Sequence, residues 1–137
     1  MRFMMIVKGD RDSEAGVMPS KELIETMTRY NEAMVKAGIM LAAEGLHPTS
    51  RGFKKKIVDG RHSIVDGPFT EAKEVVAGFW LIQVKSRDEA IAWAMRCPAE
   101  IEVREVHEIA DFPAELQEAA GNEAELRAQV ERQRHQA

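Results

Sequence analysis

Two residues of opposite charge, Glu102 and Arg104, have the chemistry and the spacing to contact a small ligand. A carboxylate can carry a proton in acid–base chemistry, and a guanidinium can hold a carboxylate or phosphate through two hydrogen bonds. Side chains two positions apart on a strand share a face, so a strand over residues 101–107 would present both together. A salt bridge, within the chain or between two copies, is the competing interpretation. This pair is the first choice for ligand contact, and Glu102 is also a weak catalytic candidate.

A second group of candidates lies in the segment Asp66-Gly67-Pro68-Phe69-Thr70-Glu71-Ala72-Lys73-Glu74. Asp66 could contact a ligand or move a proton, although aspartates in turns commonly accept a hydrogen bond from the backbone N–H two residues on. Phe69 could stack on a ligand or close the mouth of a cavity. Glu71 and Glu74 could place carboxylates at that mouth, or belong to a solvated rim.

His47, next to Pro48, is the third weak catalytic candidate besides Asp66 and Glu102. Glu44 stands three residues before it, which on a regular strand puts the two side chains on opposite faces and makes them a poor chelating pair. No pair of histidines has the spacing of a metal motif, and the sequence contains no phosphate loop, nucleophile elbow or dinucleotide fingerprint. We therefore expect neither a metal ion nor a cofactor.

The overall charge and the cysteine content bound the partners and the compartment. The net charge is −4, and the densest basic run, Lys54-Lys55-Lys56, would be split between two faces of a strand, so we interpret it as a solvated hairpin and expect no nucleic acid partner. The single Cys97 cannot form an internal disulfide. The apolar start is too short for a signal peptide or membrane span. We expect a cytoplasmic protein without a membrane partner.

Hydrophobic periodicity and turn signals predict the order strand, helix, strand, hairpin, strand, helix, strand. The first helix starts after Ser20 and stops at Gly38, and the second starts with a capping box at residues 86–89 and stops at Pro98. Asp59-Gly60 is the predicted turn of the hairpin. The predicted strands cover residues 3–7, 39–46, 53–58, 61–65, 75–84 and 101–107.

Two helices and four main strands in this order are the split βαβ pattern of ferredoxin-like folds. Right-handed crossovers would place both helices on one face of an antiparallel sheet. We therefore predict an α+β, ferredoxin-like domain over residues 1–112, with the hairpin inserted between its halves. Residues 113–137 are polar and are predicted to form a C-terminal helical tail.

The central strands are apolar on both faces, which an antiparallel sheet with one wet face would not be. In the long strand, Ala77, Phe79 and Leu81 alternate with Trp80 and Ile82. A bare apolar sheet face of this size is uncommon on a soluble monomer. A second copy of the chain, packed sheet against sheet, is the simplest cover, and the C-terminal tail is the competitor. The sequence therefore predicts a homodimer.

The segment Asp66–Glu74, together with Gly78-Phe79 and the run at residues 85–90, resembles the DGPF branch of the YCII-related family. The runs at residues 44–48 and 101–104 agree with it as well, and the resemblance extends from Met1 to about Phe112. It implies a ferredoxin-like fold, a dimeric α/β barrel, and a regulatory setting near extracytoplasmic-function sigma factors. YCII-type relatives carry a His–Asp pair at the start and end of the first helix. This chain has neither residue there, so the resemblance implies no His–Asp mechanism.

Two functions remain open at this point. The first is a small-molecule-binding or regulatory dimer that recognises a small, polar or anionic molecule in a cavity between the sheets. The second is a small enzyme without a cofactor that uses acid–base residues in the same cavity. Ferredoxin-like scaffolds host both, so the fold alone does not decide whether the chain is an enzyme.

Overall fold

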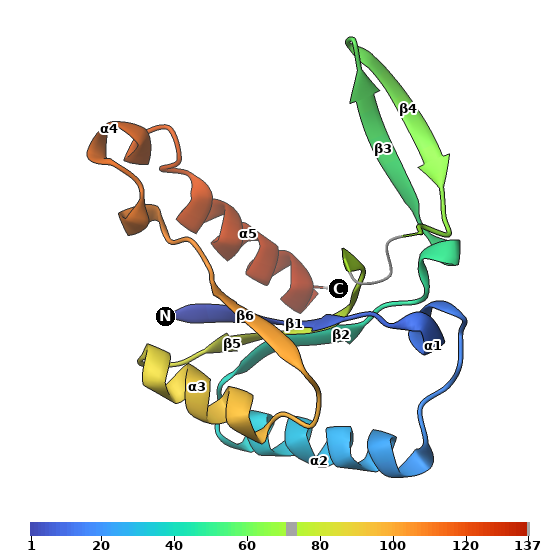
Figure 1. Cartoon of the computed structure of the whole chain (residues 1–137). Coiled ribbons are helices and arrows are strands. Elements are labelled where there is room, and N and C mark those ends of the chain that lie inside the picture. The colour runs from blue at the N-terminus through green and yellow to red at the C-terminus, as the bar shows by residue number, and fades with distance from the viewer. Residues whose placement is uncertain (71–73, 137) are drawn as a thin grey trace. The chain divides into compact units, whose positions relative to one another are not determined.

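A four-stranded antiparallel sheet organises residues 1–105, with the strand order β2-β5-β1-β6 (Figure 1). The computed structural model describes residues 1–70 and 74–136. This strand order, with neighbours in the sheet that are not neighbours in sequence, is that of the ferredoxin-like fold, as predicted. The strands are β1 (Arg2–Lys8), β2 (Met40–Gly45), β5 (Val76–Gln83) and β6 (Ile101–Glu105). The last strand ends two residues earlier than the sequence indicated.

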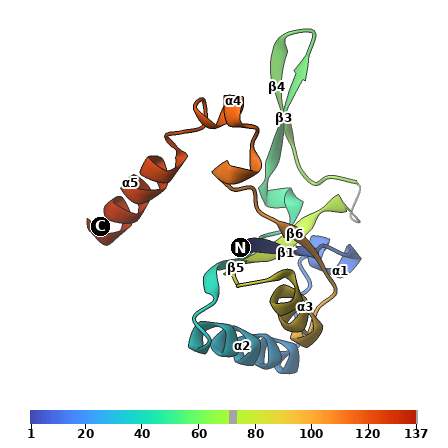
Figure 2. The ribbon, with the colours of Figure 1, turned by 90° about the vertical axis from the view of Figure 1, so that its left-hand side faces the viewer.

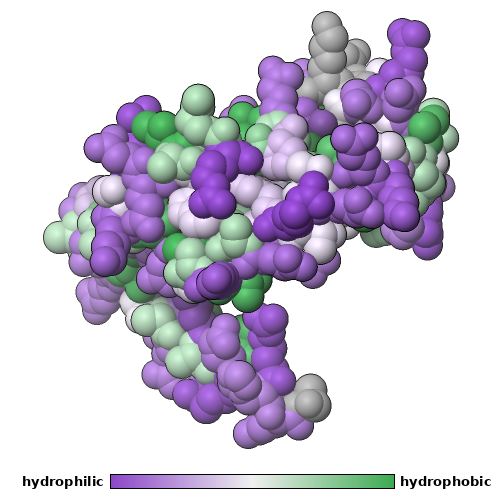
Figure 3. Space-filling model, turned by 90° about the horizontal axis from the view of Figure 1, so that it is seen from below, coloured by the Kyte–Doolittle hydropathy of each residue, from purple (hydrophilic) through white to green (hydrophobic). Residues whose placement is uncertain are grey.

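Helices α2 (Lys21–Lys36) and α3 (Arg87–Arg96) cover one face of this sheet (Figures 1 and 2). Each begins where a serine hydroxyl accepts a hydrogen bond from the backbone three residues on. Ser20 accepts the N–H of Leu23, and Ser86 accepts the N–H of Glu89, both at 3.1 Å. These caps confirm both predicted helix starts. Seen from the helix side, the surface is mainly hydrophilic, with hydrophobic residues scattered in it (Figure 3).

The core lies between the sheet and these two helices. It is formed by Phe3, Met5, Tyr30, Met34, Ile39, Trp80, Ile82, Val84 and Ala90. The Tyr30 hydroxyl donates to the carbonyl of Trp93 at 2.7 Å, and the Trp80 indole N–H donates to Asn31 Oδ1 at 2.7 Å. The two polar groups that enter the core from aromatic rings are thus satisfied.

The opposite face of the sheet is also apolar along its centre. The strand register sets Ile6 beside Phe79 and Met4 beside Leu81, on the face turned away from the core. The prediction that both faces of the central strands are apolar is therefore confirmed.

A two-stranded hairpin of β3 (Phe53–Val58) and β4 (Arg61–Asp66) projects on the side of the sheet opposite α2 and α3 (Figures 1 and 2). Its turn has positive φ at both central residues, Asp59 (φ 50) and Gly60 (φ 75), which is the twist that a two-residue hairpin turn needs. A short 3₁₀ turn, η1 (Thr49–Arg51), precedes it. The predicted hairpin is confirmed.

The short helix α1 (Arg11–Glu14) was not predicted from the sequence, which indicated neither a helix nor a strand between residue 7 and Ser20. Asp10 and Ser13 hold it through a reciprocal capping box, in which each side chain accepts the other's backbone N–H at 2.8 Å. These hydrogen bonds keep the Asp10 side chain ionised, and the pKa of Asp10 is lowered by them.

Residues from Val106 onward form a second unit with η3 (Ile109–Asp111), α4 (Ala114–Gln117) and α5 (Glu123–Gln136). Within this unit Arg127 pairs with Glu123, one turn before it, and with Glu108 at 3.2 Å. Its helices follow the prediction of a short helix and then a second one. None of the helices in the described residues is long and apolar enough to cross a membrane.

Candidate functional site

The structure places Glu102 and Arg104 on β6, both exposed, on the sheet face away from the helices. Glu102 lies opposite Ile6 and Arg104 opposite Met4, while Ile101 and Val103 pack toward the core. The pair shares a face, as the alternation predicted. No salt bridge forms between them within the described chain. Their role in ligand contact stays a prediction.

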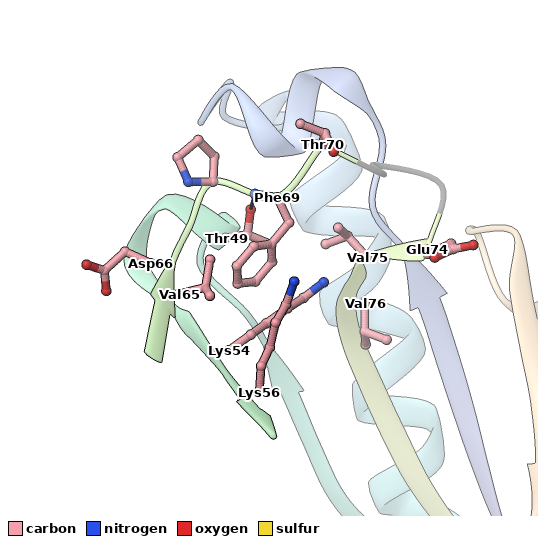
Figure 4. Close-up of a pocket in the computed structure, with 11 residues that line it drawn as sticks. Thr49, Lys54, Lys56, Val65, Asp66, Phe69, Thr70, Glu74, Val75 and Val76 are labelled. Atoms are coloured by element: carbon pink, nitrogen blue, oxygen red, sulfur yellow. Dashed lines mark hydrogen bonds between the residues drawn. The ribbon is translucent and has the colours of Figure 1, made fainter. Parts of the chain in front are cut away.

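A different set of side chains converges at the base of the hairpin. Here a pocket of about 500 Å³, called the hairpin-base pocket below, opens between η1, the hairpin and the start of β5 (Figure 4). Its lining consists of Thr49, Lys54, Lys56, Val65, Asp66, Pro68, Phe69, Thr70, Glu74, Val75 and Val76. The volume is within the range of small-molecule sites, roughly 300 to 1,000 Å³.

Lys54 and Lys56 are the cationic groups of this pocket. They are two apart on β3 and therefore on one face of the hairpin, whereas Lys55 points to the other face, paired with Ile64. Figure 4 shows both amines extending toward the Phe69 ring, and Lys54 Nζ lies 4.3 Å from the centre of that ring. Neither lysine forms an ion pair with the residues that the structure describes.

The three predicted residues that the structure describes in segment 66–74 all line this pocket. Phe69 is half-buried and forms its aromatic wall. The carboxylates of Asp66 and Glu74 point away from the lysine amines (Figure 4). Glu71 lies outside the described residues. The turn in which Asp66 would bond a backbone N–H two residues on does not form, because that residue is Pro68, which has no N–H.

Thr49 holds the aromatic wall in place. Its hydroxyl accepts the backbone N–H of Phe69 at 3.0 Å and donates to Glu14 Oε2 at 2.5 Å. Its own backbone N–H donates to Glu14 Oε1 at 2.9 Å. Gly67 passes so close to the Thr49 carbonyl that a β-carbon there would lie 1.7 Å from the oxygen. Glycine at this position is therefore required by the contact between the two loops.

The remaining candidates lie apart from this pocket. His47 is exposed beyond the end of β2, and Arg51 Nη1 approaches its Nε2 at 2.9 Å. Within residues 1–70 and 74–136, no three histidine, cysteine or acidic side chains are grouped so that they could hold a metal ion. A second cleft of about 410 Å³ lies between α2 and the sheet, with Met27, Asn31 and Trp80 among its lining residues.

Lys54, Lys56 and Thr49 were missed by the sequence analysis. The lysine run was correctly divided between two faces of the hairpin, and its lysines are exposed as expected. The sequence analysis did not anticipate that two of them also line a pocket. The i, i+2 spacing beside the Asp66–Phe69 segment was the available signal. Thr49 carries no such signal, because it contacts residues 35 and 20 positions away in the chain.

The chain is an α+β domain of the ferredoxin-like class with a pocket at the base of its hairpin that two lysines line. Residues 1–113 match the family model of the YCII-related domain, and the chain belongs to this family.

The chain is also similar to two individual proteins. The chain is 37% identical over 79 residues to an uncharacterized protein of Rhizobium meliloti (strain 1021). That match covers 55% of this chain and 64% of the relative, so it spans less than two thirds of the relative's length. A solved structure, 5-chloro-2-hydroxyhydroquinone dehydrochlorinase from Burkholderia phenoliruptrix AC1100 in complex with 2,5-dihydroxybenzoquinone, is similar with 14% identity and a TM-score of 0.45. The similarity covers 79% of this chain and 95% of that one.

Proposed function

We propose that this chain is a small-molecule-binding protein whose ligand is an anion with an apolar body, bound in the hairpin-base pocket. The observation that carries the proposal is the direction of Lys54 and Lys56, whose amines extend into one apolar-walled pocket without an ion-pair partner in the described chain. A carboxylate or phosphate between the amines would form charge-assisted hydrogen bonds.

The rest of the lining supports a ligand with an apolar part. The lining includes the apolar side chains of Phe69, Val65, Val75 and Val76. The Thr49 hydroxyl is already engaged by Glu14 and Phe69, so it does not compete for the ligand's polar groups. Of the charged side chains in the lining, the lysine amines extend toward Phe69, whereas the carboxylates of Asp66 and Glu74 point away from them (Figure 4). An anionic ligand should therefore bind more tightly than a neutral molecule of the same shape.

The catalytic alternative has weaker support. Asp66, His47 and Glu102 are all exposed, and they lie on β4, beyond β2 and on β6 respectively. Acid–base catalysis is favoured by carboxyl or imidazole groups held in an enclosed site, where their proton affinity can be tuned. The geometry thus favours binding over catalysis.

The proposal is tested by titrating the protein at low ionic strength with benzoate, with inorganic phosphate and with benzamide, which has the shape of benzoate without its charge. Chemical shifts of the backbone amides around Phe69 report binding. We expect benzoate or phosphate to bind and benzamide to bind at least tenfold more weakly. Lys54→Gln and Lys56→Gln should each lower the affinity for the anion by about three- to tenfold, because each removes one charged hydrogen-bond donor.

Lys55→Gln is the matched control, since it removes the same charge from the same strand on the opposite face. If all three lysine variants lower the affinity equally, the effect is a general loss of positive charge and the pocket is not the site. If neither anion shifts the amides around Phe69 at any accessible concentration, the proposal is wrong.

We also propose that the chain acts as a cytoplasmic homodimer, with the sheet face away from the helices as the contact surface. Ile6, Phe79 and Leu81 form an apolar strip along the centre of that face, and Glu102 and Arg104 would then lie at its edge as the predicted ligand contacts. The lone Cys97 is consistent with a reducing compartment.

Sedimentation velocity tests the dimer. We expect a dimer at micromolar concentration, and a monomer for Leu81→Lys, which buries a charge in the contact. Met95→Lys adds the same charge at an exposed position of α3, on the helix-covered side of the sheet, and should leave the dimer unchanged. If the wild-type protein sediments as a monomer up to about 100 µM, the proposed dimer is wrong, whereas the proposal for the hairpin-base pocket is unaffected. Titrating Arg104→Ala with the same anions tests whether Arg104 contacts a ligand at the edge of the sheet.

A further inference from the structure

One carboxylate outside the hairpin-base pocket is connected to its aromatic wall by hydrogen bonds. Glu14, the last residue of α1, accepts both the backbone N–H and the hydroxyl of Thr49, at 2.9 and 2.5 Å. Both of its oxygens are therefore used on a single residue of η1. Hydrogen bonds to an ionised acceptor are the stronger kind, so this contact fixes η1 against α1.

The bond to Glu14 also determines what the Thr49 hydroxyl can do next. A hydroxyl has one proton, and here that proton is donated to Glu14 Oε2. Its lone pairs then face the other way, where they accept the backbone N–H of Phe69 at 3.0 Å. Each bond polarises the next, so the two bonds strengthen one another.

The position of Phe69 in turn determines the position of a cation. The Lys54 amine lies 4.3 Å from the centre of the Phe69 ring, a distance at which an ammonium is attracted to the ring face. A lysine side chain is otherwise flexible, with four rotatable bonds. The contact with the ring therefore restricts the positions that the Lys54 amine adopts before a ligand binds.

We propose that Glu14 is a positioning residue for the hairpin-base pocket. Through Thr49 it fixes the backbone at Phe69 and thereby the position of the ring, and the ring in turn fixes the position of the Lys54 amine. This inference rests on the proposed function of the pocket as an anion site. Glu14 itself does not line the pocket and is not expected to touch the ligand.

The test uses the full chain with 4-fluorophenylalanine incorporated at position 69, so that the ¹⁹F resonance reports the surroundings of the ring with or without ligand. Glu14→Gln and Thr49→Val should move or broaden this resonance. Thr49→Ser keeps the hydroxyl and should restore the wild-type signal. Because both variants break the same chain of bonds, the double variant should show no more change than the larger single one.

Asp12→Asn is the control for charge, since Asp12 is an exposed carboxylate on the same short helix. In the titration with benzoate and phosphate, Glu14→Gln should lower the affinity for the anion about three- to fivefold. Thr49→Val should lower it by a similar factor. Asp12→Asn should leave both the resonance and the affinity unchanged.

The outcomes separate this inference from the proposed function. If wild-type protein binds neither anion but the ¹⁹F resonance still responds to Glu14→Gln and Thr49→Val, the pocket function fails and the positioning network stands. If anions bind and depend on Lys54, while Glu14→Gln leaves the resonance and the affinity at wild-type values, the positioning role is wrong. A resonance that moves equally in Asp12→Asn would also overturn it.

Discussion

Replacing Gly67 by alanine is the most direct test of how the segment Asp66–Phe69 docks. An alanine β-carbon at this position would lie 1.7 Å from the carbonyl oxygen of Thr49 and 2.6 Å from its carbonyl carbon. Both distances are far inside van der Waals contact, and both partners are backbone atoms that cannot rotate away. The two loops must therefore separate by more than 1 Å or so.

The cost follows from what that separation breaks. Overpacking in a close contact costs roughly 1–3 kcal/mol. The hydrogen bonds from Gly67 N–H to the Gly52 carbonyl, 2.9 Å, and from Phe69 N–H to Thr49, 3.0 Å, would be weakened as well, at about 1 kcal/mol each. We expect Gly67→Ala to lower the free energy of unfolding by about 3 to 5 kcal/mol.

Urea denaturation followed by circular dichroism measures this difference. Gly52→Ala is the matched control: it lies in the partner loop, directly after η1, its β-carbon would lie 3.6 Å from the same Thr49 oxygen, and its φ of −128° is open to any residue. It should change the free energy of unfolding by less than about 0.5 kcal/mol. Equal stability of Gly67→Ala and Gly52→Ala would refute the docking of this segment on Thr49.

The remaining predictions concern Tyr30 in the core. Tyr30→Phe removes the hydroxyl that donates to the Trp93 carbonyl at 2.7 Å, so we expect a loss of about 1–2 kcal/mol in the same urea experiment. Burial raises the pKa of Tyr30 above its ordinary value of 10.0, so the neutral phenol is favoured in the folded protein. Its contribution is complete below about pH 10 and is lost as the pH rises further, so wild-type stability should fall more steeply between about pH 10 and 12 than that of Tyr30→Phe. Parallel pH profiles for the two proteins would show that this phenol is not held neutral by the fold.

Local signals in the sequence account for most of the fold. The helix starts at Ser20 and Ser86 follow from side chains that bond the backbone three residues on, and the hairpin turn at Asp59-Gly60 from residues that accept positive φ. Alternation along the long strand separated Trp80 and Ile82 from Phe79 and Leu81, and the structure packs Trp80 and Ile82 in the core. The short helix at residues 11–14 was missed because its capping box uses a serine as the second partner instead of the usual glutamate.

The candidate site was predicted only in part. Phe69 was expected either to stack on a ligand or to close the mouth of a cavity, and in the structure it lines the hairpin-base pocket. Lys54 and Lys56 are exposed, as a charge run on a hairpin usually is. Their i, i+2 spacing indicates that they share a face, but it does not say which pocket residues lie beside them. Glu102 and Arg104 share a face as predicted, but that face and the hairpin-base pocket are formed by different strands.

The sequence by itself determined the order of strands and helices, the faces of each strand and the family of the chain, because periodicity, caps and turns act over a few residues. Only the tertiary structure decided that Glu14, Thr49 and Phe69 form one chain of hydrogen bonds beside two lysines. Those contacts join residues 20 and 35 positions apart in loops. These loops become neighbours only when the sheet has formed, and a pattern that extends over a few residues cannot indicate which loops will meet.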